Sequence, residues 1–405
     1  MKTQIDIQFF LTYGYFPNYR PKYNPEKVDK IEVNYTSYSD LQSQFYQVFD
    51  TVIKETIESI PKDKLIVIPI SGGLDSRAIL AVALKHVNPN RIRTYTFGVK
   101  GSYDFEIGQQ VAKKAGIHHD AIELNSLRFT QEEMLEVAKR CDFQTHLFHH
   151  PPLKKLEEII SDNYVISGYM GDVVFGSSAN TVFSNPDRSQ DYYLRCKKYS
   201  YKSTTLDSVD YKVYLEPIKE VSIIPHFDQL LLFERGSKLI APHILMKGDW
   251  TYKVPLIDKR ILDFMYSIPN TFRLDERLFI DTMLSYYPDL FNIRAKTTFG
   301  CHLKAPKVFL LVKRLKNKII LNLNRYLNLD ITYPPYNYID FNKEILRRPD
   351  LKLIFESNLQ DLEKRAILTA IKPMEVLKRH KKTKNLYGIL VLLTSLELIL
   401  KAKEQ

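Results

Sequence analysis

The run VIPISGGLDSR at residues 67–77 constrains this chain more than any other segment. An apolar stretch typical of a buried strand leads directly into a Ser-Gly-Gly turn, and an Ala- and Leu-rich helix pattern begins at Asp75. Glycine lacks a Cβ and lets the backbone approach a bound anion, and the first N–H groups of a helix attract negative charge. The segment therefore predicts a turn that binds nucleotide phosphates. Its glycine spacing, with no lysine after Gly73, excludes a Walker loop.

A second turn of this kind, SGYMGD at Ser167–Asp172, follows another apolar strand pattern at Tyr164–Ile166. Because the carboxyl ends of parallel strands meet at one edge of a sheet, Asp75 and Asp172 are expected to face each other across one nucleotide. Magnesium usually binds through one or two carboxylates together with phosphate oxygens and waters. The two turns therefore predict a Mg²⁺ site formed by Asp75 and Asp172.

Strand and helix patterns alternate between residues 61 and 190, which indicates an α/β fold with a parallel sheet and flanking helices. Residues 1–60 are predicted to form an irregular, hinge-like segment followed by a helix. Residues 191–405 contain periodic stretches of helical spacing and are predicted to form a helical lobe that completes the active site. The apolar stretch at 386–400 is too short for a membrane span and contains Glu397, so a buried helix is expected.

The first turn resembles that of the PP-loop ATP pyrophosphatases, whose fold is of the adenine nucleotide alpha hydrolase type and which cleave ATP between the α- and β-phosphates. The second turn, VPLIDKR at 254–260 and RAKTTF at 294–299 resemble, in the same order, segments of the synthetase domain of the asparagine synthetase family. The segment FLTYGYFP at 10–17 is similar to the hinge that enters that domain. This resemblance implies ATP-dependent, AMP-forming amide synthesis, in which a carboxylate is activated as an acyl-adenylate for attack by ammonia or an amine.

The same resemblance implies roles for individual residues. Lys296 matches a catalytic lysine that stabilises the negative charge developing as ATP reacts, while Asp75 and Asp172 match the metal-binding carboxylates. The residues implied to contact ATP are Ile70, Ser71, Gly72, Gly73, Asp75, Ser76, Phe97, Ser167 and Gly168. ATP and Mg²⁺ are thus the expected cofactors, and a small-molecule carboxylate and ammonia or an amine are the expected partners.

Three positions depart from the family pattern, because Tyr169, Val173 and Thr251 stand where the family has acidic residues. These losses remove acid–base groups that would serve an aspartate substrate, although Glu234 or Asp249 could compensate. Because position 2 is a lysine, the family's glutaminase domain with its N-terminal cysteine is expected to be missing from this chain. The nitrogen is therefore expected to come from free ammonia, from a separate amidotransferase subunit or from an amine on the second substrate.

The composition bears on the cellular compartment and on the partners of the protein. Three widely spaced cysteines, Cys141, Cys196 and Cys301, form no CxxC pattern, which favours a reducing compartment and a cytoplasmic location. The net charge is +11, with basic runs at 313–318 and 378–382. We interpret these runs as solvated helix faces in preference to sites that attract an acidic substrate or a membrane surface. Because no aromatic residues are interleaved with the basic ones, nucleic acid is not expected as a partner.

The histidines at 146–150 and the overall function each leave alternatives open. His146, His149 and His150 have near-helical spacing, for which an ordinary helix surface is favoured over a metal site. A PP-loop tRNA-modifying enzyme would share the first turn and explain the basic charge. A non-catalytic relative that binds nucleotide would explain the lost acidic residues.

Overall fold

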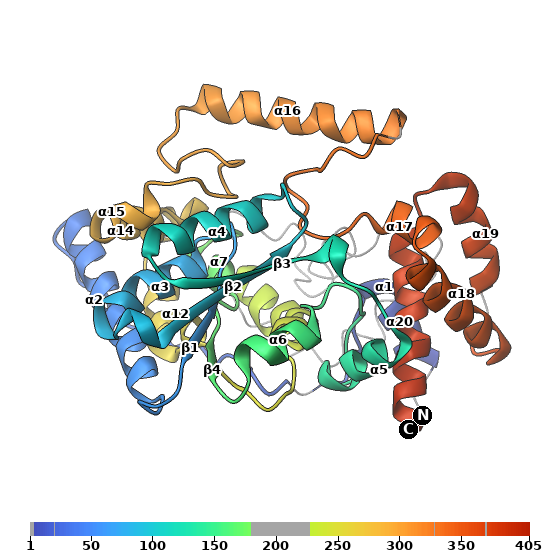
Figure 1. Cartoon of the computed structure of the whole chain (residues 1–405). Coiled ribbons are helices and arrows are strands. Elements are labelled where there is room, and N and C mark those ends of the chain that lie inside the picture. Colours follow the sequence, from blue (N-terminus) through green and yellow to red (C-terminus); the bar gives the residue numbers. More distant parts are fainter. Residues whose placement is uncertain (1–3, 20, 180–226, 328, 369–370) are drawn as a thin grey trace.

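A five-stranded parallel sheet lies beside a group of C-terminal helices in the computed structural model, which describes residues 4–19, 21–179, 227–327, 329–368 and 371–405 (Figure 1). The strand order is β3-β2-β1-β4-β5. The strands are β1 (Ile66–Pro69), β2 (Ile92–Gly98), β3 (His118–Glu123), β4 (Tyr164–Ile166) and β5 (Thr251–Lys253). All four strand pairs are parallel, so every strand ends at the same edge of the sheet.

The central position of β1 follows from its composition. Ile66, Val67 and Ile68 are fully buried, as expected for a strand that is covered on both faces. In the ladders on either side, Ile66 is paired with Ile92 of β2 and with Tyr164 of β4. This register brings the turn after β1 next to the turn after β4.

Helices cover the sheet and one another. The helices α3 and α4 pack against β1 and β2, and α2 packs against α3, α12 and α14. The helices of this part are α2 (Tyr38–Glu58), α3 (Asp75–His86), α4 (Tyr103–Ala115), α5 (Gln131–Arg140), α6 (Leu153–Ile160), α7 (Gly171–Phe175), α10 (Phe227–Leu230), α11 (Ala241–Ile244), α12 (Lys259–Ser267), α13 (Asn270–Arg273), α14 (Arg277–Tyr286) and α15 (Pro288–Phe291). A π-helix, η5 (Leu231–Ile240), joins α10 to α11.

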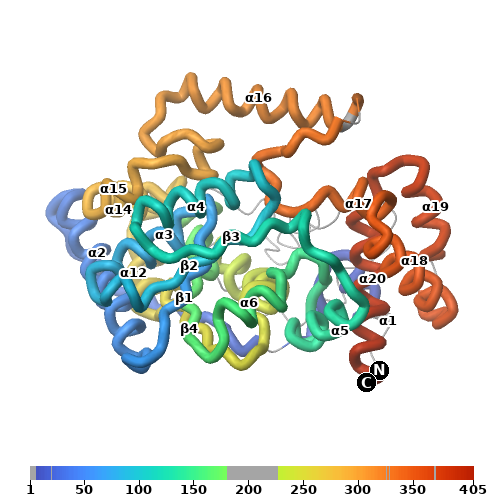
Figure 2. The backbone as a smooth tube through the Cα atoms, viewed as in Figure 1, coloured from blue at the N-terminus to red at the C-terminus, as the bar shows by residue number. Residues whose placement is uncertain are grey.

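The C-terminal part is helical. Its helices are α16 (Lys307–Tyr326), α17 (Phe341–Arg347), α18 (Pro349–Lys364), α19 (Pro373–Thr383) and α20 (Tyr387–Glu404). The helix α20 packs against α18, α5 and the N-terminal helix α1 (Gln4–Tyr13), which lies beside it in Figure 2. By contrast, α16 runs along the outside of the molecule, separated from the other C-terminal helices (Figure 1).

The α/β fold with its helical C-terminal part is confirmed, and the apolar stretch at 386–400 forms the buried helix α20, as predicted. Two details differ from the prediction. The irregular N-terminal segment contains α1, which buries Phe9 and Phe10. The predicted helical lobe also contributes β5 to the sheet. The predicted boundary at residue 190 and Cys196 lie outside the described residues, within which Cys141 and Cys301 are free thiols.

Candidate active site

The Ser-Gly-Gly turn leaves β1 at the carboxyl edge of the sheet, and α3 begins at Asp75. Inside the turn, the Gly73 N–H donates to Ser71 Oγ at 3.1 Å. The Gly72 N–H donates to Asp104 Oδ1, at the start of α4, at 3.2 Å. A backbone N–H of the turn therefore holds a carboxylate, which is the kind of contact that a phosphate oxygen would also make.

The turn after β4 fits against the first turn because two of its residues lack side chains. A Cβ at Gly168 would lie 2.8 Å from Ser76 Oγ, and a Cβ at Gly171 would lie 2.7 Å from Asp75 Cγ. Both separations are shorter than the contacts that Cβ atoms make in proteins. A larger residue at either position would therefore push the two turns apart. The glycines of the second motif therefore serve the close approach of the two loops.

Asp75 and Asp172 meet in this contact, as the sequence predicted from their positions after neighbouring strands. The backbone N–H of Asp172 donates to Asp75 Oδ2 at 3.2 Å. Asp75 Oδ1 is buried and has no hydrogen-bond partner within the described part of the chain. Burial, followed by the charges of Asp172 and Glu276, raises the pKa of Asp75 well above its usual range. Burial likewise raises the pKa of Asp172.

Glu276 is a third carboxylate at this place, and the sequence analysis missed it. Burial, with smaller contributions from Asp172 and Asp275, raises the pKa of Glu276 to about 8. Asp275 and Glu276 both adopt left-handed backbone conformations, with φ of 53° and 59°, in the turn that leads into α14. Such conformations are uncommon for residues other than glycine and cluster at functional sites. The sequence offers only a pair of adjacent acids as a signal.

The acidic groups fit a magnesium ion that also binds phosphate. No group of three or more His, Cys, Asp or Glu side chains in the described ranges has the arrangement of a complete metal cage. Magnesium does not need one, because it binds through one or two carboxylates plus phosphate oxygens and waters. The unpartnered, buried Asp75 Oδ1 beside Asp172 is the atom that such an ion would satisfy.

Lys296 reaches the same edge of the sheet from a distant part of the sequence. Its backbone N–H donates to the Gly72 carbonyl at 2.8 Å, and its ammonium pairs with Asp104. The Lys296 side chain is 43% exposed, and its charge partly offsets the effect of burial on the pKa of Asp172. Lys296 therefore lies beside the Ser-Gly-Gly turn, and its contact with phosphate stays a prediction.

Arg77 fixes the segment that carries Lys296, a role that the sequence analysis did not assign. The Arg77 guanidinium is fully buried and donates to the carbonyl of Arg294 at 2.9 Å and that of Leu290 at 3.5 Å. Burial lowers the pKa of Arg77 to about 10. Because Arg77 follows the first motif directly in the sequence, it links the turn to the Lys296 segment.

Phe97 lies at the end of β2, where a distant segment covers the strand. Asn337 donates from Nδ2 to the Phe97 carbonyl at 2.8 Å, and its own carbonyl accepts from the Val99 N–H at 3.0 Å. The Tyr103 N–H donates to the Pro334 carbonyl at 2.7 Å. All residues predicted to contact ATP thus lie along one edge of the sheet, in the two turns and at the end of β2. Their contact with ATP stays a prediction.

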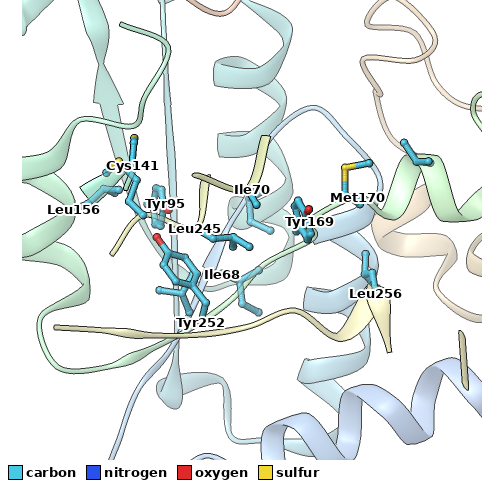
Figure 3. Packing of buried hydrophobic residues seen from close by; sticks show 14 of the residues in the cluster. Ile68, Ile70, Tyr95, Cys141, Leu156, Tyr169, Met170, Leu245, Tyr252 and Leu256 are labelled. Carbon is cyan, nitrogen blue, oxygen red and sulfur yellow. The ribbon is translucent and has the colours of Figure 1, made fainter. Parts of the chain in front are cut away.

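The three residues that depart from the family pattern have different surroundings. Tyr169 lies among buried apolar side chains (Figure 3), and its hydroxyl has no hydrogen-bond partner among the residues described. Burial raises the pKa of Tyr169, so that the phenol stays neutral. Val173 is buried and Thr251 is exposed on the edge strand β5. None of these three positions supplies a charge to the site.

Residues of η5 approach the second turn. Glu234, which was considered as a replacement for the lost acids, is buried and pairs with Lys238 at 2.9 Å. The charge of Arg235 counteracts the burial that raises the pKa of Asp172. This helix therefore presents a positive charge to the carboxylates of the site.

The histidines at 146–150 are not on a helix surface, and that expectation is wrong. His146, His149 and His150 lie in an irregular segment, in which His146 and His150 are buried and His149 is half-buried, and His146 Nε2 lies 3.3 Å from His149 Nδ1. Burial lowers the pKa of His149 and of His150 to about 3. The three side chains are therefore neutral and form part of the core between the N-terminal segment and α20.

The parallel sheet, the Ser-Gly-Gly turn and the second acidic turn together define an α/β protein with the PP-loop fold. Residues 60–214 match the family model described as asparagine synthase, of which 180–214 lie outside the described residues. This part of the chain is therefore an asparagine synthase family domain.

Two curated relatives carry the same family name. A probable asparagine synthetase (glutamine-hydrolyzing) of Acanthamoeba polyphaga mimivirus is 23% identical over 311 residues, which cover 73% of this chain and 49% of the viral protein. Asparagine synthetase (glutamine-hydrolyzing) 3 of Arabidopsis thaliana is 26% identical over 193 residues, covering 44% of this chain and 31% of the plant protein. The chain therefore spans about half the length of the first relative and about a third of the second.

Proposed function

We propose that this chain catalyses ATP-dependent, AMP-forming amide synthesis. A carboxylate attacks the α-phosphate of ATP, pyrophosphate leaves, and ammonia or an amine then displaces AMP from the acyl-adenylate. The asparagine synthase family domain and the relatives named asparagine synthetase support this type of reaction. The site residues support it independently.

The observation that carries the proposal is the meeting of three segments at one edge of the sheet. Gly72 of the first turn accepts a hydrogen bond from the backbone of Lys296, and Asp75 accepts one from the backbone of Asp172. Phosphate-binding N–H groups, two carboxylates and an ammonium are therefore arranged around one place. A triphosphate with its cation needs this combination of charges.

Each part of the site has a defined task in the proposed reaction. Asp75 and Asp172 would hold Mg²⁺, which supplies charge stabilisation to the leaving pyrophosphate. The N–H groups of the turn and of the first turn of α3 bind phosphate oxygens. Lys296 stabilises the negative charge that develops on the α-phosphate and on the acyl oxygen. Arg77 positions the Lys296 segment through the carbonyls that it holds.

The acid that is activated is proposed to be less polar than aspartate at the part that faces the second turn. Tyr169 and Val173 replace family acids there, and both are buried. Neither position offers a carboxylate to an aspartate α-amino group. Such a loss of a partner for a charged group disfavours the polar substrate strongly.

The test is a product analysis with Mg-ATP, ammonium and a panel of small amino-acid and hydroxy-acid carboxylates. We expect AMP and pyrophosphate to form only when a suitable acid is present. Release of ADP and phosphate instead would contradict cleavage between the α- and β-phosphates. Asp63→Asn is a matched control for variants of the site, since Asp63 is exposed in the loop before β1.

A second candidate, a relative that binds nucleotide without turning it over, is favoured by one observation. Tyr169, Val173 and Thr251 bring no charge to the site. Tight binding of Mg-ATP, measured by calorimetry, together with unchanged ATP throughout the whole panel would support this candidate. Acid-dependent formation of AMP would exclude it.

A further inference from the structure

The helix α16 exposes an apolar face along its whole length. Of the fifteen large apolar side chains that are exposed in the described part of the chain, eleven lie between residues 308 and 331. Six of them share one side of α16 because they follow a spacing of three and four residues: Val308, Leu311, Val312, Leu315, Ile319 and Tyr326. We call these six residues the outer face of α16. At 20 residues, the helix is about 30 Å long.

The opposite side of α16 is attached to the protein, which fixes the direction of the outer face. Asn317 is 4% exposed, and its side-chain amide exchanges hydrogen bonds with the Tyr103 hydroxyl at 3.1 and 3.2 Å. The Arg314 guanidinium lies 4.8 Å from the centre of the Phe299 ring. The outer face therefore points away from the sheet, in agreement with the place of α16 at the rim of the molecule (Figure 1).

The charge of α16 is of one sign. Its sequence, KVFLLVKRLKNKIILNLNRY, contains six Lys and Arg residues and no Asp or Glu. Lys307, Lys316 and Lys318 are exposed, and their helical positions place them on the two borders of the outer face. An apolar stripe with basic borders is typical of helices that lie in the interface of a membrane, where lysine ammoniums reach the headgroups.

We propose that the outer face of α16 binds to the surface of a membrane that contains anionic lipids. The apolar side chains would enter the boundary between headgroups and acyl chains, while the lysines at the borders contact lipid phosphates. No helix in the described ranges is long and apolar enough to cross a bilayer, so the contact concerns the surface. The proposal does not depend on the reaction at the sheet edge.

Two other occupants fit the charges less well. A second copy that packed its outer face on this one would bring the three border lysines of each helix together with no acid on α16 to balance them, and like charges repel. A nucleic acid would accept the lysines, but its bases stack on aromatic rings, whereas the outer face of α16 consists mainly of valine, leucine and isoleucine side chains. An anionic membrane satisfies both the apolar and the basic parts.

The test is flotation of the purified chain with vesicles of phosphatidylcholine alone and of phosphatidylcholine with phosphatidylglycerol. We expect binding to the anionic vesicles that weakens as salt increases, and little binding to the neutral ones. The double variant Leu315→Gln/Ile319→Gln should lose binding at least ~10-fold, since about 0.8 kcal/mol is lost per buried CH₂. Lys316→Gln/Lys318→Gln should weaken it about fivefold for each lysine.

The matched control is Leu353→Gln, since Leu353 is a leucine on α18 with 70% exposure. It should bind vesicles as the parent does, and circular dichroism should show the same helix content in all variants. Three results would overturn the proposal. The first is that the Leu315→Gln/Ile319→Gln variant binds vesicles as well as the parent. The second is that the parent binds no vesicles but forms a dimer that this variant converts to a monomer. The third is that the parent binds no vesicles but binds an RNA oligonucleotide through the lysines alone.

Discussion

The Lys296 ammonium pairs with the carboxylate of Asp104, although the two residues lie far apart in the chain. The other oxygen of that carboxylate accepts the Gly72 N–H at 3.2 Å. Asp104 thus engages a cation and a backbone donor that phosphate oxygens are proposed to use. In the proposed complex, ATP and the Asp104 carboxylate would therefore compete for the same two groups.

Asp104→Asn should tighten the binding of ATP. The variant removes the competing charge while the amide oxygen can still accept the Gly72 hydrogen bond. About 1 kcal/mol for a partly exposed ion pair corresponds to about a fivefold lower Kd. Calorimetric titration with Mg-ATP measures this change, with Asp63→Asn as the control. Weaker binding in Asp104→Asn would show that Asp104 supports the nucleotide.

Asp75→Asn and Asp172→Asn should each lower the rate of AMP formation at least ~10²-fold, since each removes a charge that stabilises the reacting phosphates. The double variant should be little worse than either single one, because both carboxylates serve one cation. The measurement is the initial rate of AMP formation at saturating ATP for the parent, the two single variants and the double variant. Fully multiplicative losses would mean that the two residues act separately.

Lys296→Ala should lower kcat and kcat/KM together by ~10²-fold or more, and ATP affinity should stay within a few-fold. The ammonium interacts most strongly in the transition state, when charge builds on the α-phosphate. Lys296→Arg should not restore the rate fully, since a planar fork replaces a compact charge. Lys304→Ala, an exposed lysine of the same segment, is the control. Weaker ATP binding with unchanged kcat would instead make Lys296 a ground-state ligand.

His150 should make folding sensitive to acid. Its pKa is lowered to about 3 by burial, so the unfolded chain binds more protons than the folded one between about pH 3 and 6.5. The contribution of His150 to the free energy of unfolding is therefore fully present above pH 6.5. As the pH falls below that value, this contribution decreases by up to about 1.4 kcal/mol per pH unit. Urea unfolding at several pH values should show a smaller acid dependence for His150→Leu. A variant of the exposed His118, His118→Gln, should keep the parental slope.

The sequence was sufficient for the parts of the fold and site that depend on local pattern. The Ser-Gly-Gly turn with the strand before it and the acidic turn after β4 could be recognised because each combines an apolar run with small residues. Their meeting followed from a general property of parallel sheets. The contact between Asp75 and Asp172 confirms that step.

Other features depend on contacts between distant segments and gave no local signal. The strand β5 has only three residues, and its pairing with β4 decides its conformation. Glu276 reaches the site from the turn before α14, and Asp104 reaches it from α4, and no motif marks either of them. The spacing of the histidines at 146–150 imitates a helix, yet packing against α20 buries that segment, where Leu147 donates to Ser395 at 2.8 Å.

The formation of an acyl-adenylate is tested most directly by the exchange of labelled pyrophosphate into ATP. The parent protein is incubated with Mg-ATP, labelled pyrophosphate and each carboxylate of the panel, without ammonium or amine. We expect label to enter ATP only with an acid that the site accepts, and this exchange should fall at least ~10²-fold in Asp75→Asn but not in Asp63→Asn. Binding of ATP without exchange for any acid, or exchange that is the same in Asp75→Asn, would contradict adenylation at this site.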